Sequence, residues 1–300
     1  MAIFHEKEIR HIFGILWFLG AWFCFALNAA LSKLLKETSS VATILLFQNC
    51  IGFLLILPLL LIRGVKLLKT DHPYLIFSRA LVAFLAISGI FLASQRMPIT
   101  DAMLLTNLSP FFVPFIVWIF LKKPINHKLW IGISIGLIGI IFILRPGIKI
   151  FNEGDIYGIG SALMVAFSTV LLRVLANKKV PVSTILFYLF LICALLSIPL
   201  GIIYWVKPTK ENILILIVTG FIFAFAQFSF ANALRHAKAT HLGPFNYSAI
   251  VFGAVFDWLF FHNVPKLTTL IGILLVGTGG TLTFLLTKPP HNPPPKTHKH

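Results

Sequence analysis

Long apolar segments, separated by short polar stretches, occupy almost the whole chain. A helix needs about 20 predominantly apolar residues to cross a bilayer. Ten segments approach or reach that length: 12–32, 43–62, 74–94, 101–121, 129–144, 156–175, 183–205, 213–233, 241–261 and 266–286. The pattern predicts an all-α membrane protein with ten transmembrane helices. The final stretch, 288–300, is KPPHNPPPKTHKH, whose prolines and charges predict a disordered tail.

Composition agrees with a membrane protein and gives the excess of basic residues a specific meaning. Of 300 residues, 58% are hydrophobic and 11% are charged, whereas soluble domains carry about 25% charged residues. A formal net charge of +16 in a soluble protein would point to nucleic acid, but here the basic residues lie between apolar segments. We therefore expect a small-molecule solute and a lipid bilayer as partners, no nucleic acid, and a monomer or homodimer.

The motifs of enzymes and metal proteins are missing from the sequence. Cys24, Cys50 and Cys193 are isolated in apolar segments, which favours packing roles over a disulfide framework or a metal site. The chain has no P-loop, nucleophile elbow or HExxH motif. We expect no cofactor and no enzymatic activity. A channel or a membrane scaffold is the alternative class, although a channel needs more polar residues along its pore.

Lysine and arginine are distributed unequally between the two sets of loops. With the N-terminus inside, the inner segments hold 16 basic residues and the outer segments hold 8. Cytoplasmic loops carry the excess of Lys and Arg in membrane proteins. The distribution predicts that both termini are cytoplasmic, in a multi-pass protein of the plasma membrane, which in a bacterium is the inner membrane.

The chain repeats itself, without gaps, at an offset of 140 residues. At this offset Trp118 aligns with Trp258 and Thr100 with Thr240, together with several glycine pairs. Each repeat holds five predicted helices, and because five is odd, the two repeats enter the membrane from opposite sides. The sequence therefore predicts two inverted five-helix repeats, as in secondary transporters with a site between the repeats. The predicted units are 1–145, 146–287 and the cytoplasmic tail 288–300.

Both repeats carry polar residues and helix-breaking residues at corresponding places. Such paired interruptions are the best indication of a transport site that a sequence offers. The predicted breaks are at Pro110 and Pro114 in the first repeat and at Gly243 and Pro244 in the second.

Polar side chains in the middle of apolar segments are the candidates for binding a solute. The predicted substrate-binding residues are Tyr247, Asn246, Asn107, Gln227, Asn28 and Ser168. Tyr247 offers a flat ring and a hydroxyl, which suit an amphipathic metabolite. Hydrogen bonds between helices are the alternative role for the amides, because transmembrane helices are often joined in this way.

Two charged residues inside apolar segments are candidates for gating or energy coupling. Asp257 lies three helical turns beyond Asn246, about 16 Å along the axis. It either carries a proton, lies hydrated at the outer rim, or pairs with a base such as Lys266, and we expect a structural or gating role. Arg79 is predicted to reach the cytoplasmic interface as an anchor, with binding of an anionic solute as the second interpretation.

The segment 79–112, RALVAFLAISGIFLASQRMPITDAMLLTNLSPFF, resembles the third and fourth helices of the EamA-like branch of the drug/metabolite transporter superfamily. The resemblance rests on Arg79, Ala93, Pro98, Asp101, Ala102 and Pro110, and on Pro244 and Tyr247 in the second half. Where many members carry Gly-Glu, this chain has Lys122-Lys123 and His262-Asn263.

The resemblance implies a ten-helix secondary transporter with a central cavity that works by alternating access. The expected solute is an amino acid or a related amphipathic metabolite, including nucleotide-derived compounds such as S-adenosylmethionine. The resemblance indicates a superfamily and leaves the solute and the direction of transport open.

Overall fold

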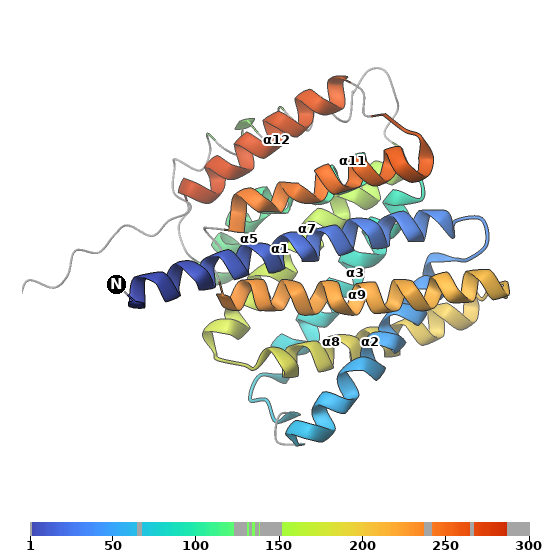
Figure 1. The fold of residues 1–300 in the computed structure, drawn as a ribbon, viewed down its shortest axis with the longest axis horizontal. Coiled ribbons are helices and arrows are strands. Elements are labelled where there is room, and N and C mark those ends of the chain that lie inside the picture. Colours follow the sequence, from blue (N-terminus) through green and yellow to red (C-terminus); the bar gives the residue numbers. More distant parts are fainter. Residues whose placement is uncertain are drawn as a thin grey trace, which may run out of the picture.

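The computed structural model describes residues 2–64, 68–122, 152–236, 242–264 and 267–286, together with positions 131, 134, 135 and 138. Within this part of the chain the protein is all-helical and contains no strand (Figure 1). The helices of the described residues include α1 (Ala2–Leu34), α2 (Val41–Arg63), α3 (Pro73–Ser94), α4 (Ile99–Thr106), α5 (Ser109–Leu121), α7 (Glu153–Asn177), α8 (Val182–Ile203), α9 (Lys210–His236), the 3-10 helix η2 (Gly243–Tyr247), α11 (Ser248–Phe261) and α12 (Leu267–Leu286).

Seven helical segments of the described chain are long and apolar enough to cross a membrane. They begin at Ile12, Val41, Pro73, Ile99, Glu153, Val182 and Lys210, and each corresponds to one predicted span. Two shorter apolar helices, Phe245–Phe261 and Leu270–Gly279, lie in the last two predicted spans. The predicted span 129–144 falls almost entirely outside the described residues, as does the tail. The prediction of an all-helical protein is confirmed.

The predicted fourth span is divided into α4 and α5 by a turn at Asn107 and Leu108. Pro110 lies in the first turn of α5, where its missing N–H costs no helical hydrogen bond. Its ring would clash with the carbonyl of Thr106 in a continuous helix, and Thr106 is the last residue of α4. Pro114 lies inside α5, which continues to Leu121. The break expected at Pro114 is therefore wrong, because α5 continues through this residue.

The helices pack in pairs that join distant parts of the chain. The most extensive pairs are α1 with α9, α3 with α7, and α2 with α8, and α11 packs against α4 and α1. Figure 1 shows α1 and α9 running side by side. Between α3 and α7 the approach is close, because a Cβ on Gly89 would lie 3.0 Å from the Cβ of Ser161. Small residues allow transmembrane helices to approach in this way.

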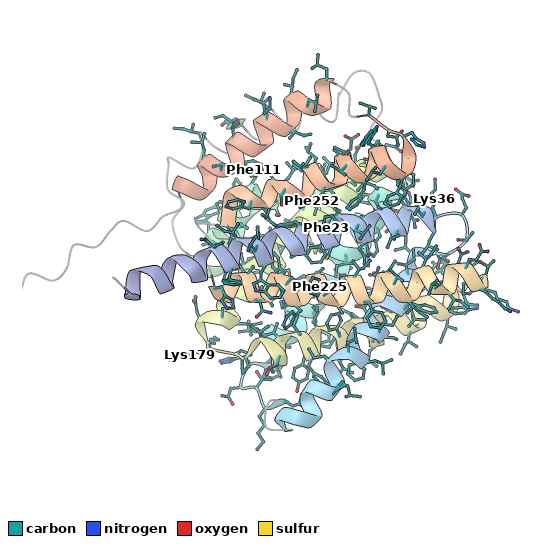
Figure 2. The ribbon with its side chains drawn as sticks, in the orientation of Figure 1. Phe23, Lys36, Phe111, Lys179, Phe225 and Phe252 are labelled. Carbon is teal, nitrogen blue, oxygen red and sulfur yellow. The ribbon has the colours of Figure 1, made fainter. Side chains whose placement is uncertain are left out.

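Large apolar side chains cover the outside of the helix bundle. Phe23 is 43% exposed and Phe225 is 51% exposed, and both lie along the middle of the bundle in Figure 2. The basic residues Lys36 and Lys179 lie at opposite ends in the same view. An apolar belt between polar ends is the surface that a bilayer requires.

Helices α5 and α11 end in the same unusual way. Lys122 follows α5 with a φ of 51°, and His262 follows α11 with a φ of 53°. This left-handed conformation is the one that glycine adopts with least strain at the end of a helix. The two residues stand where Gly-Glu was expected from the resemblance, so the backbone there keeps a glycine-like shape without glycine.

Candidate functional site

Two interruptions of the helices lie against one apolar cluster. Asn107 follows α4 at the first interruption, and Tyr247 is the last residue of η2 at the second. The side chain of Tyr247 packs on a cluster that contains Leu105 and Leu108 from the first interruption and Ile250 from α11. The packing therefore places Tyr247 against residues that flank Asn107 in the sequence.

Polar atoms at these interruptions are buried without hydrogen-bond partners among the described residues. The Asn107 amide nitrogen donates to the carbonyl oxygen of Met103 over 2.8 Å, but its Oδ1 accepts no hydrogen bond. The hydroxyls of Tyr247 and Ser248 are likewise buried without a hydrogen-bond partner among the described residues. A buried polar group without a partner costs about 1–3 kcal/mol. Such groups are therefore candidates for contacts with a bound solute.

Asn28, another predicted binding residue, has both of its polar atoms engaged between helices. Its Nδ2 donates to the carbonyl oxygen of Thr219 on α9 over 2.8 Å, and its Oδ1 accepts from Gln48 Nε2 on α2 over 2.6 Å. In this conformation Asn28 therefore ties α1 to two neighbouring helices.

The other predicted residues are more dispersed. Gln227 is buried on α9, Ser168 is half-buried on α7, and Asn246 is half-buried in η2. Of the second break, the structure describes the backbone of Gly243 and Pro244, which lie in η2.

Sequence reasoning missed the buried amides of α2. Gln48 is 0% exposed and Asn49 is 2% exposed. Asn49 Nδ2 donates to Ser197 Oγ on α8 over 3.1 Å, so the two residues join α2 to helices of both halves. Two adjacent amides inside an otherwise apolar segment were a signal that could have identified them.

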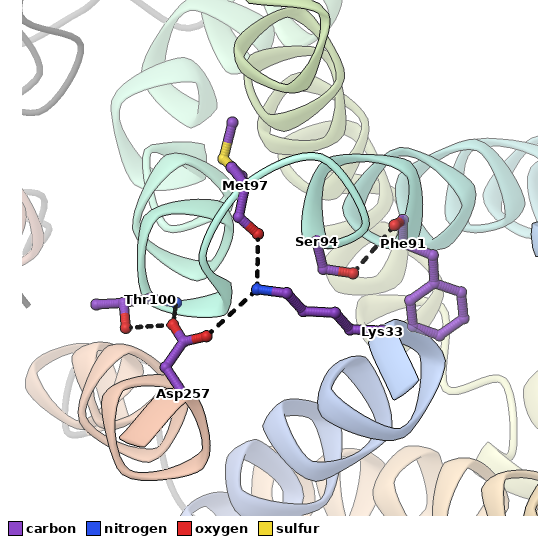
Figure 3. A network of polar contacts seen from close by, with 6 residues as sticks. All are labelled: Lys33, Phe91, Ser94, Met97, Thr100 and Asp257. Carbon is purple, nitrogen blue, oxygen red and sulfur yellow. Dashed lines mark hydrogen bonds and ion pairs between the residues drawn. The ribbon is translucent and has the colours of Figure 1, made fainter. Parts of the chain in front are cut away.

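Asp257 lies near the end of α11 in a buried polar network (Figure 3). Its Oδ2 accepts from the backbone N–H and the hydroxyl of Thr100, over 2.6 and 2.7 Å. Lys33 at the end of α1 lies 3.5 Å from its Oδ1 and donates to the carbonyl oxygen of Met97 over 3.1 Å. The Lys33 ammonium also lies 4.6 Å from the centre of the Phe261 ring.

This arrangement bears on two of the interpretations of Asp257, the hydrated rim residue and the ion pair. The residue is 1% exposed, so it is not a hydrated rim residue, and its observed partner is Lys33. The alternative partner, Lys266, lies outside the described residues. Pro98 at the start of α4 provides no side-chain cap, and the carboxylate accepts the free N–H of Thr100 instead. Asp257 therefore caps α4 from another helix, where the helix dipole favours a negative charge.

Arg79 lies inside the bundle instead of reaching a polar end. It is 5% exposed, and its Nε and Nη1 have no hydrogen-bond partner among the described residues. The expectation of an interfacial anchor is therefore wrong for this conformation.

No group of three His, Cys, Asp or Glu in the described part of the chain is placed to hold a metal ion. The three cysteines are free thiols, and Cys193 is buried.

Comparison with known proteins gives this arrangement a context. The profile of the EamA-like transporter family matches the chain twice, over residues 12–145 and 152–285. The S-adenosylmethionine uptake transporter of Rickettsia prowazekii is 26% identical over 263 residues, which cover 88% of this chain and 89% of that protein.

Two further relatives carry different names. The pseudopaline exporter CntI of Pseudomonas aeruginosa is 30% identical over 265 residues, covering 88% of this chain and 93% of that protein. The riboflavin transporter of Vibrio cholerae is 27% identical over 280 residues, covering 90% and 92%. A solved crystal structure with 18% identity aligns with a TM-score of 0.65 over 91% of this chain and 96% of its own, which shows a shared fold.

The family matches span nearly the whole chain, and the relatives are transporters, not enzymes. Together with the apolar helices, they establish an integral membrane protein that transports small metabolites. The chain belongs to the EamA-like transporter family.

Proposed function

We propose that this protein moves an amphipathic solute of the S-adenosylmethionine type across the plasma membrane by alternating access. The transporter consists of two inverted five-helix repeats, residues 1–145 and 146–287, followed by a cytoplasmic tail. The solute binds between the repeats, at the two helix interruptions.

Three structural correspondences support the inverted repeat. At the 140-residue offset, the pairing of α1 with α9 corresponds to the pairing of α7 with α3. The interruptions at Asn107 and Tyr247 are related by the same offset, as are the left-handed residues Lys122 and His262. Unrelated halves would have no reason to place these features at one common spacing.

Orientation follows from charge and from the positions of the chain ends. The start of α1 and the end of α12 lie at the same end of the bundle in Figure 1, as an even number of crossings requires. Lys179, assigned to the inner side, and Lys36, assigned to the outer side, lie at opposite ends in Figure 2. The excess of basic residues on the proposed inner segments supports a cytoplasmic position for both termini.

The observation that carries the site is the pair of unpartnered buried atoms, Asn107 Oδ1 and the Tyr247 hydroxyl. Their burial makes a polar group of the solute the natural partner, because hydrogen bonds between solute and protein would remove the cost of leaving them unpaired. Tyr247 also offers its ring for stacking with a planar group. Gln227, Asn246 and Ser168 are further candidates for contacts, and Asn28 is assigned to holding α1 in place.

The relatives suggest which solute to test first. Those from Rickettsia are named for uptake of S-adenosylmethionine, and this compound combines a flat base with polar groups, as an aromatic and amide-lined site requires. The exporter among the relatives leaves the direction of transport to experiment.

Asp257 closes the outer end of the path in this conformation. Its contacts to Lys33 and Thr100 join α11 to α1 and α4, and access from that side requires these contacts to separate. Because Asp257 joins three helices through Lys33 and Thr100, we assign it the role of a gate. The gradient of the solute and the membrane potential then drive transport.

Counterflow of radiolabelled S-adenosylmethionine in proteoliposomes tests the proposal. We expect saturable exchange by the wild type and at least about tenfold slower exchange in Tyr247→Phe and Asn107→Ala, because each removes a polar contact. Tyr188→Phe is the matched control, since the Tyr188 hydroxyl donates to the carbonyl oxygen of Leu68. Asn232→Ala is the control for the amide, which donates to the carbonyl oxygen of Phe228.

Unchanged exchange in both site variants would move the site elsewhere in the protein. Exchange of riboflavin but not of S-adenosylmethionine would instead change the proposed solute while leaving the site in place.

A further inference from the structure

The interior of the bundle contains a positive charge that the described protein does not neutralise. Arg79 on α3 is 5% exposed, and two of its three guanidinium nitrogens, Nε and Nη1, are buried without a hydrogen-bond partner. An ion taken out of water is costly unless another charge and hydrogen bonds compensate for it. The guanidinium of Arg79 therefore lacks a counter-ion among the described residues.

The acidic residues of this chain are few, and three of them form ion pairs with other basic residues. The full sequence has 9 acidic residues. Asp257 pairs with Lys33, Glu153 pairs with Arg96, and Glu37 pairs with Lys36. Among the side chains that the structure describes, none forms an ion pair with Arg79. The counter-ion is therefore best sought outside the protein.

Arg79 lies at the seam between the two halves of the sequence. Its helix, α3, packs against α7 and α8, which both belong to the second half. The thiol of Cys193 on α8 donates to the carbonyl oxygen of Ala80, the residue next to Arg79, over 3.6 Å. Ser161 on α7 donates to the carbonyl oxygen of Ala86 on the same helix over 2.7 Å. In transporters built from repeats, the solute binds at this kind of seam.

We infer that Arg79 receives an anionic group of the transported solute, and that this group is a carboxylate. The inference rests on the proposed transport of an amphipathic metabolite and restricts its chemical class. A guanidinium presents its N–H groups in a planar fork that matches the two oxygens of a carboxylate. Cys193, the neighbour on α8, offers only a thiol, which gives the guanidinium no counter-charge.

A comparison of two buried cations tests this assignment without any solute. Lys33 has a partner in Asp257, whereas Arg79 has none among the described residues. Replacing an unpaired buried charge by an apolar residue of similar length removes the free-energy cost of burying that charge. Removing one member of an ion pair instead leaves the other member buried without a counter-charge, which destabilises the protein. In purified protein without solute, we expect Arg79→Met to melt at or above the wild-type temperature and Lys33→Met to melt below it.

Transport of a matched pair of solutes tests the chemical class. S-adenosylmethionine and its decarboxylated analogue differ only in the carboxylate. In proteoliposome counterflow, we expect the wild type to prefer S-adenosylmethionine by at least about tenfold, as a charged hydrogen-bonded contact implies. Arg79→Gln should lose the preference, and Arg79→Lys should retain part of it. Arg96→Gln is the control, because Arg96 is exposed and pairs with Glu153.

The outcomes separate this inference from the proposed function. If Arg79→Met melts as far below the wild type as Lys33→Met does, Arg79 is a structural residue and the inference is wrong. Equal exchange of the two solutes by the wild type would reject the carboxylate while leaving transport of this solute class intact. If neither compound is exchanged, the proposed solute is wrong, and the comparison of melting temperatures alone tests whether Arg79 binds an anion.

Discussion

Lys33 and Asp257 are 224 residues apart in the chain, and their charged groups lie 3.5 Å apart between the ends of α1 and α11. Asp257 is 1% exposed and the Lys33 side chain is 15% exposed, so water screens this pair only partly. We expect Asp257→Asn to lower the free energy of unfolding by about 1–3 kcal/mol, because it leaves the ammonium without its counter-charge. Thermal melting of the purified protein measures this change.

The control for that variant is Glu37→Gln. Glu37 forms an exposed ion pair with Lys36 at 3.9 Å, and exposed pairs contribute little to stability. Equal melting temperatures for Asp257→Asn and wild type would show that the buried network does not hold this end of the protein together.

The paired state of Asp257 also predicts how transport responds to a proton gradient. Because the carboxylate is neutralised by Lys33 and bonded to Thr100, we expect an imposed pH gradient at fixed voltage to cause no concentrative uptake into proteoliposomes. Strong accumulation that disappears in Asp257→Asn, with counterflow retained, would show that this carboxylate carries a proton.

Adjacent lysines after α7 provide a test of backbone strain. Lys179 has a φ of 58°, whereas Lys178 has a φ of −81°. Glycine relieves the strain of the left-handed conformation but costs entropy elsewhere. We expect Lys179→Gly to raise the free energy of unfolding by about 0.5–1 kcal/mol and Lys178→Gly to lower it by a similar amount. Melting curves of the two variants check the signs, and equal shifts would contradict the explanation.

The amides of Asn28 and Gln48 should depend on each other energetically. They share a buried hydrogen bond of 2.6 Å between α1 and α2. Each single change to alanine should cost about 1–3 kcal/mol, because the partner is left unsatisfied. The double variant should cost clearly less than the sum, as a double-mutant cycle of unfolding in detergent can measure. Additive losses would mean that the two side chains act independently.

The inverted repeat predicts the side on which each loop lies. Reporter fusions after Lys69 and at the C-terminus should show a cytoplasmic location, and a fusion after Lys149 should show an external one. The physical reason is the excess of basic residues on the inner segments. Reporters that place corresponding loops of both halves on the same side would contradict the inverted arrangement.

The helices were predictable from the sequence because membrane burial requires long apolar segments, whatever their neighbours are. The break near Asn107 was also predictable in outline, since Pro110 cannot continue a helix past Thr106. The continuation of α5 through Pro114 was not, because it depends on where the preceding break had already formed.

Side-chain partners were much less accessible to sequence reasoning. Nothing local to Asp257 indicates Lys33, since their contact depends on how α1 packs against α11. The burial of Arg79 likewise follows from the packing of α3 against α7 and α8, and not from its place near the start of an apolar segment. The roles of Asp257 and Arg79 that the sequence left open therefore depend on how the helices pack.

The close contact of Gly89 with Ser161 limits the kind of motion that can open this protein. This contact joins α3 of the first half to α7 of the second. The hydrogen bond from Asn28 to Thr219 likewise joins α1 of the first half to α9 of the second. Movement of the two halves of the sequence as separate rigid bodies would therefore break both the α3–α7 contact and the α1–α9 contact. We therefore expect the bodies that move during transport to contain helices from both halves of the sequence, so that they do not coincide with the two proposed repeats.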